Sequence, residues 1–147
     1  MSASVRRLAA LALASSLLAA GAAAAGAQAR PALRIDSLRV VQANGRAAAP
    51  PYRRAARHDY VVAFRLGRTR LARVTRAATL ISPRGFVVAA VRPRATLADP
   101  GAYRARARLA IGADDAPGVY VLRYTVVARG EDGSVARARK VVRLRFR

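Results

Sequence analysis

Residues 118–147 alternate between apolar and polar side chains in two runs that flank a short polar turn. The turn, residues 129–133, carries two glycines and an Asp-Gly step, which is typical of a β-hairpin. A period of two places one set of side chains in a core and the other in water, so we expect two antiparallel strands here. The alternating apolar residues are Tyr120, Leu122, Tyr124 and Val126, then Val142, Leu144 and Phe146.

Five further runs with strand character precede this hairpin, and turn-rich segments separate them. They cover residues 32–42, 58–67, 71–82, 86–91 and 103–111. No stretch of this region has the period of a helix. Seven short strands in about a hundred residues predict an all-β fold, a seven-stranded antiparallel immunoglobulin-like sandwich.

Two of these runs depart from simple alternation. The first changes phase near Asp36 and Ser37, which predicts a bulge or a switch between sheets. Residues 86–91 are apolar on both faces, as expected for a central or covered strand, and Pro93, Pro100 and Gly101 then predict a loop.

The first 29 residues have the pattern of a secretory signal peptide. Arg6 and Arg7 precede an uncharged stretch rich in Ala and Leu, and small residues offer cleavage after Ala27 or Ala29. The alternative is an N-terminal membrane anchor of about 20 residues. We expect cleavage, so that residues 30–147 form one domain, free of transmembrane segments, in an exported protein that is periplasmic or secreted.

The charge is the most unusual property of the composition. The whole chain has a formal net charge of +21, and the predicted signal peptide removes only two of the positive residues. Such a field attracts anionic polymers and surfaces of any kind. The alternative is a solvated surface that tolerates arginine without a ligand.

The segment Asp115–Tyr124 resembles the entry to the penultimate strand of bacterial immunoglobulin-like, fibronectin-III-like and macroglobulin-type domains. The resemblance implies the sandwich architecture alone, because the antibody-type Cys, Trp and Cys are missing. The turn Gly130–Ser134 is also similar to that of periplasmic copper-carrier sandwiches. Those proteins have a histidine where Ser134 stands, so the resemblance does not extend to the copper ligand.

The sequence offers little for metal binding or catalysis. There is no cysteine, and His58 is the single histidine, which beside Asp59 we interpret as a surface or turn pair. The acidic pairs at 114–115 and 131–132 flank one predicted strand, so they would lie about 33 Å apart and share no ion. The serines lie outside nucleophile motifs, and the many arginines oppose the raised pKa that a general acid needs. We expect no metal, no cofactor and no enzymatic activity.

Arginines at every second position form two ladders along predicted strands. Their side chains would project from a strand about 6.6–7 Å apart and suit bidentate pairing with phosphate, sulfate or carboxylate. In an immunoglobulin-like sandwich these two strands belong to different sheets, so the ladders would coat opposite outer surfaces. The candidate polyanion-binding residues are Arg104, Arg106 and Arg108 in the first ladder, and Arg137, Arg139, Lys140, Arg143, Arg145 and Arg147 in the second.

These features predict an accessory or binding module of the cell envelope that holds an anionic polymer or lipid surface. The alternative is an adaptor that docks on an envelope protein through an edge strand, with the charge serving solubility only. Nucleic acid is a third candidate ligand, but the export signal argues against it.

Overall fold

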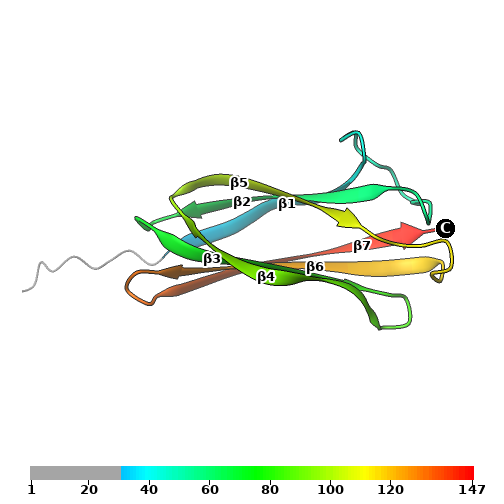
Figure 1. Ribbon diagram of the computed structural model, residues 1–147. Coiled ribbons are helices and arrows are strands. Elements are labelled where there is room, and N and C mark those ends of the chain that lie inside the picture. The colour runs from blue at the N-terminus through cyan, green and yellow to red at the C-terminus, as the bar shows by residue number, and fades with distance from the viewer. Residues whose placement is uncertain (1–30) are drawn as a thin grey trace, which may run out of the picture.

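The computed structural model describes residues 31–147, which form two antiparallel β-sheets packed face to face (Figure 1). One sheet has three strands in the order β1-β2-β5, and the other has four in the order β4-β3-β6-β7. This confirms the predicted all-β, two-sheet fold, whereas the predicted signal peptide lies outside the described residues. The strands are β1 (Ala32–Gln42), β2 (His58–Gly67), β3 (Ala72–Ile81), β4 (Val87–Ala98), β5 (Gly101–Leu109), β6 (Gly118–Gly130) and β7 (Val135–Phe146).

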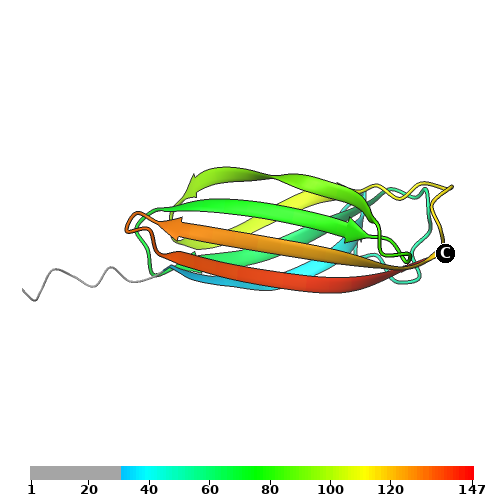
Figure 2. The same cartoon turned by 90° about the horizontal axis from the view of Figure 1, so that it is seen from below.

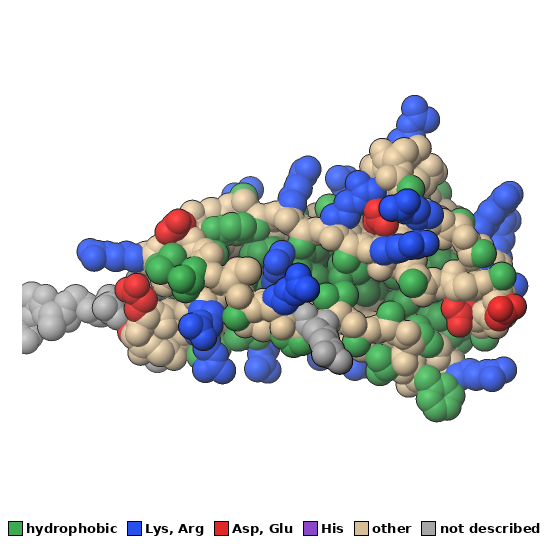
Figure 3. Space-filling model, viewed as in Figure 1, with side chains coloured by type: hydrophobic (Ala, Val, Ile, Leu, Met, Phe, Trp, Pro, Cys, Tyr) green, Lys and Arg blue, Asp and Glu red, His purple; other side chains and the backbone are tan. Residues whose placement is uncertain are grey.

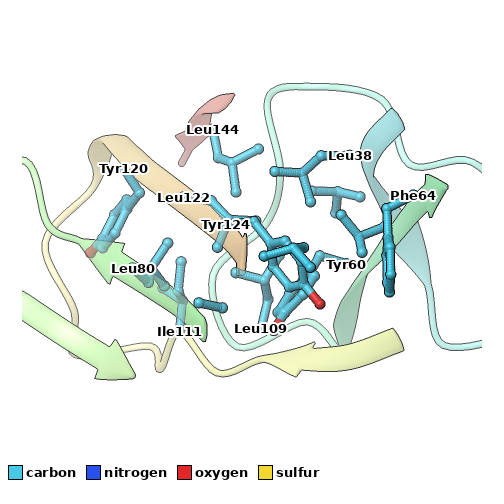
Figure 4. Close-up of a cluster of buried hydrophobic side chains, with 14 of the residues drawn as sticks. Leu38, Tyr60, Phe64, Leu80, Leu109, Ile111, Tyr120, Leu122, Tyr124 and Leu144 are labelled. Carbon is cyan, nitrogen blue, oxygen red and sulfur yellow. The ribbon is translucent and has the colours of Figure 1, made fainter. Parts of the chain in front are cut away.

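The core lies between the two sheets and consists of the side chains that point inward at alternate positions along the strands (Figure 4). Full burial of a Val or Leu side chain stabilises the fold by roughly 1.5–3 kcal/mol. The largest completely buried side chains are Tyr120, Leu122, Leu144, Val41, Val62, Val74 and Val126. β6 lies inside its sheet, between β3 and β7, and contributes three of them.

The predicted C-terminal hairpin is confirmed. β6 and β7 pair from Gly118↔Phe146 to Arg129↔Val135. At the turn the amide of Gly130 donates to the carbonyl of Ser134 at 2.9 Å, and Gly133 has a φ of 79°, which glycine adopts without strain. Asp132 Oδ1 accepts a hydrogen bond from the amide of Ser134 at 2.9 Å and so stabilises this turn.

The predicted irregularity in the first strand is a β-bulge. The register of β1 against β2 shifts between Ile35 and Ser37. The extra residue returns Leu38 and Val40 to the same inner face as Ile35, so the phase change in the sequence keeps the strand in one sheet.

The prediction that residues 86–91 are covered is wrong. β4 is the edge strand of the four-stranded sheet, and Phe86, Val87 and Val91 are exposed. The predicted loop after Pro93 is also wrong, because β4 continues to Ala98 beyond a register irregularity at that proline. An edge strand tolerates proline, since one side of its backbone has no partner strand.

The two long sides of the sandwich differ. On one side β7 lies beside β1 (Figure 2), and the Lys140 ammonium donates to the carbonyl of Asp36 at 3.4 Å across the seam. On the other side β5 and β4 each end their sheet, and they do not pair with each other. We call this second side the open side; it includes the exposed residues of β4 described above.

The positions of two leucines predict a large and a negligible effect on stability. Leu122 is 2% exposed in the core, whereas Leu97 is 69% exposed on β4. We expect Leu122→Ala to lower the free energy of unfolding by about 2–5 kcal/mol, because it leaves a cavity, and Leu97→Ala to change it by less than about 0.5 kcal/mol. Urea unfolding followed by circular dichroism measures both. Equal effects would contradict the described core.

Candidate anion-binding face

The second arginine ladder lies on the outer face of the four-stranded sheet. Along β7 the residues that alternate with the core-facing set are all exposed. They include Arg137, Arg139, Arg143 and Arg145, which stand on one face because Leu144 and Phe146 point into the core.

The pairing of β7 with β6 brings a third cation, Arg123, beside two of these arginines. Arg123 of β6 lies opposite Val141, and Val141 stands between Arg139 and Arg143 along β7. Diagonal neighbours on one face of an antiparallel pair are about 7–8 Å apart, within reach of long side chains. Three guanidinium groups therefore surround one exposed valine, and we call Arg123, Arg139 and Arg143 the arginine triangle.

Neutral residues separate most of the arginines on this face. Arg139 lies opposite Thr125, and Arg143 lies opposite Val121. Like charges directly opposite each other destabilise a sheet, and Arg73 and Arg129 stand in that position on this face. The arrangement along β7 avoids this cost. It also leaves apolar and hydroxyl groups between the cations, where they can contact the uncharged parts of a ligand.

The outer face of the four-stranded sheet contains no acidic residue. None of its four strands, all within the described part of the chain, includes Asp or Glu. The exposed arginines of this face therefore have no carboxylate neighbour on their own sheet. We call them together the arginine face: Arg73, Arg123, Arg129, Arg137, Arg139, Arg143 and Arg145.

The three-stranded sheet differs because carboxylates neutralise part of its charge. Asp36 accepts from Arg34 Nε at 2.8 Å and from Arg65 Nε at 3.1 Å. Asp59 accepts from Arg106 Nε at 2.6 Å, and its side chain is only 10% exposed. Three arginines of this sheet are thus held in ion pairs.

The first predicted ladder therefore divides into two kinds of residue. Arg104 and Arg108 are exposed on β5, whereas Arg106 binds Asp59 and also donates to the carbonyl of Ala43 at 2.8 Å. Arg106 holds the loop after β1 against β5, which is a structural role. The two ladders lie on different sheets, as the sequence predicted.

Two residues of the second ladder point elsewhere. Lys140 has the inward phase of β7 and reaches the carbonyl of Asp36 across the closed seam. Arg147 follows β7, and its amide donates to the carbonyl of Tyr52 at 2.9 Å. Neither belongs to the arginine face.

Arg147 instead lines a depression of about 530 Å³ at the loop end of the sandwich, together with Arg53 and Arg57. His58 also lines it, and the interpretation of His58 and Asp59 as a surface or turn pair is wrong. Both are buried, because the loop after β1 covers the start of β2. The His58 ring packs edge-on against Tyr52 with centroids 5.4 Å apart.

A buried tyrosine pair lies between the sheets. The rings of Tyr60 and Tyr124 meet edge to face with centroids 6.0 Å apart. Burial, followed by the neighbouring Tyr124, raises the pKa of Tyr60 to about 12, although the charge of Arg76 acts in the opposite direction. Arg76 has the inward phase of β3, so its charge lies near both hydroxyl groups.

Residues 31–147 contain no cluster of three or more His, Asp or Glu side chains that could hold a metal ion. Nor does this part of the chain include a helix of the length and apolarity needed to cross a membrane.

The geometry defines a two-sheet β-sandwich with one acid-free, arginine-rich outer face. No protein-family model and no curated protein matches the sequence. Among solved structures, the C-terminal domain of Wzt is similar over 81% of this chain and 75% of its own, with a TM-score of 0.59 and 11% sequence identity. The ApaA protein from Bordetella pertussis gives a TM-score of 0.45 at 15% identity over 80% of this chain and 94% of its own. The likeness to the Wzt domain supports the all-β fold and nothing beyond it.

Removing Arg106 should destabilise the fold. In Arg106→Gln the Asp59 carboxylate stays buried without its charged partner, so we expect a loss of roughly 1–3 kcal/mol in the free energy of unfolding. Arg104 lies on the same strand and forms no ion pair within residues 31–147, so Arg104→Gln should change the free energy of unfolding by less than about 0.5 kcal/mol. Urea denaturation measures both variants. A harmless Arg106→Gln would show that the ion pair is not structural.

The tyrosine pair predicts a loss of stability in alkali. Tyr60 ionises near pH 10 in the unfolded chain and near pH 12 in the fold, so its contribution is complete below pH about 10 and disappears as the pH rises toward about 12. In Tyr60→Phe the urea midpoint should fall less steeply across this window. The same slope in both proteins would show that Tyr60 does not contribute.

Proposed function

We propose that this protein is an exported, non-enzymatic binding module of the cell envelope, and that its arginine face holds an anionic polymer or lipid surface. The observation that carries the proposal is the absence of any acid from the four strands of that sheet. Arginine-rich surfaces that serve only solubility need no such segregation. On the opposite sheet, carboxylates engage three of the arginines.

The arrangement of the arginine face favours a ligand with repeated charges. Four arginines lie along β7, and alternate side chains of one strand stand about 6.6–7 Å apart. Guanidinium groups form paired hydrogen bonds with phosphate, sulfate or carboxylate. A linear polyanion could therefore meet several arginines along β7 and the arginine triangle beside them.

The fold supports a finer assignment of the sandwich. We infer an immunoglobulin-like or fibronectin-III-like domain over residues 30–147. In constant-type immunoglobulin domains the first, second and fifth strands share a sheet with the fourth, and the last two strands lie with the third in the other sheet. The observed orders β1-β2-β5 and β4-β3-β6-β7 support the assignment for six strands, and β4 differs because it pairs with β3.

Export and the place of action rest on the N-terminal sequence. Residues 1–29 have the charged start, the uncharged stretch and the small-residue cleavage sites of a signal peptide. We propose that the domain acts in the periplasm or outside the cell, where anionic polymers and lipid headgroups are abundant partners.

The test is the salt dependence of binding. Dextran sulfate and vesicles of phosphatidylglycerol with phosphatidylcholine serve as polymer and lipid probes. The logarithm of the binding constant falls linearly with the logarithm of the salt concentration, and each lost charge contact reduces the magnitude of that slope by about 0.7–0.9. We expect the variant Arg123→Gln, Arg139→Gln, Arg143→Gln to lower that slope by about 2–3 for at least one probe, as measured by titration between about 0.05 and 0.3 M salt.

A matched variant separates the face from the total charge. Arg39→Gln, Arg104→Gln and Arg108→Gln remove the same charge from exposed positions of the three-stranded sheet. We expect a slope change well below 1 in this variant. Equal losses in the two triple variants would mean that net charge attracts the ligand and that the arginine face is not the site.

A further inference from the structure

The two sheets are unequal at the open side. β5 is the edge strand of the three-stranded sheet, and β4 is the edge strand of the four-stranded sheet that faces it. Hydrophobic side chains are visible between these two strands when the molecule is seen from this side (Figure 3). Within residues 31–147, no strand of the three-stranded sheet covers the middle of the inner face of β4, where Val91, Arg94 and Thr96 are exposed.

Exposure along β4 shows this gap residue by residue. Val91 pairs with Ala78, which is 4% exposed in the core, yet Val91 itself is 47% exposed. Thr96 pairs with Val74, which is 1% exposed, and Thr96 is also exposed. Partners across an antiparallel pair point to the same face, so the middle of the inner face of β4 overhangs the core and meets solvent. Ala89 and Ala98, nearer the ends of β4, still pack against the core.

A strand added to the free edge of β5 could fill the gap. It runs from Gly101 to Leu109 without a proline, and β2 is the only strand of residues 31–147 that pairs with it. The backbone groups on its other side have no partner strand, which makes this edge a template for an added strand. Its outward side chains are Arg104, Arg106 and Arg108, and they alternate with the inward Tyr103, Ala105, Ala107 and Leu109.

A pair of arginines marks the same gap. Arg76 of β3 lies directly opposite Arg94 of β4, and Arg76 has the inward phase of its strand. Like charges in this position repel each other. Neither forms an ion pair with an acid among the described residues. A carboxylate placed between the sheets at this point would relieve the repulsion.

We propose that an extended strand of an acidic partner protein pairs with the free edge of β5 and completes the three-stranded sheet. Its inward side chains are mainly apolar and cover Val91 and its neighbours on β4. Its outward side chains are acidic and lie beside Arg104 and Arg108. One inward carboxylate meets Arg76 and Arg94. The open side therefore recognises a strand of the partner in which apolar and acidic side chains alternate.

Charge excludes two other occupants. A second copy joined edge to edge through β5 would place its Arg104, Arg106 and Arg108 beside the same residues of the first copy, which is destabilising. Residues 1–30 of this chain contain arginines but no Asp or Glu, so they cannot supply the acidic side chains.

The probe is a blocked synthetic peptide of about seven residues that alternates Glu and Val. We expect it to slow hydrogen exchange at β5 amides and to leave β7 amides unchanged, measured by NMR on the full protein. A peptide with the same side chains but N-methylated alternate amides keeps the charge and loses the strand hydrogen bonds. It should bind at least about tenfold more weakly. Equal binding of the two peptides would overturn the proposal, because charge alone would then explain the affinity.

Two matched valines locate the site. Val91 on the inner face of β4 and Val141 on the outer face of β7 are both 47% exposed, and both lie near arginines. Val91→Glu should weaken binding of the alternating peptide about tenfold or more, because the new charge would be buried against the strand. Val141→Glu should change it less than about twofold.

Three further results would overturn the proposal: equal losses in the two variants, protection of β7 by the peptide, and protection of β5 that appears without peptide as the protein concentration rises. The last would assign the edge to a second copy. Dextran sulfate binding by Val91→Glu tests the proposed function separately, because the arginine face is intact in that variant.

Discussion

The structure depends on the burial of one face of β6. This strand lies inside the four-stranded sheet, and Tyr120, Leu122 and Val126 are among its nearly inaccessible side chains. Because side chains alternate along a strand, the burial of these residues determines which residues of β6 face outward. The register of β7 and β3 against β6 then determines which of their residues share that outer face.

This constraint explains how a chain with a formal charge of +21 can fold around an apolar core. Nearly every charged side chain stands in the outward phase of a strand or in a loop. Asp59 of β2 also stands in the outward phase, but the loop after β1 buries it, and Arg106 is its partner at 2.6 Å. Lys140 has the inward phase of β7 and reaches the carbonyl of Asp36 across the seam. Arg76 keeps an inward phase, but it lies beside the open side, where solvent reaches the gap.

The same geometry divides the surface into parts with different chemistry. The outer face of the four-stranded sheet has arginines without carboxylates, which suits an anionic ligand. The opposite sheet pairs part of its charge internally through Asp36 and Asp59. The open side combines a free strand edge with exposed valine and an unneutralised arginine pair, which suits a strand of a partner.

The sequence by itself determined the strands other than the second half of β4, the bulge near Asp36, the C-terminal hairpin and the two ladders, because a period of two is a local property of the chain. Only the tertiary structure decided that residues 86–91 form an exposed edge and that His58 and Asp59 are buried, since burial depends on which distant segment covers a residue. It likewise placed Arg106 in an ion pair, and Arg123 opposite Val141 and diagonal to Arg139 and Arg143. Those groupings follow from the register between strands, a long-range property that alternation along one strand does not contain.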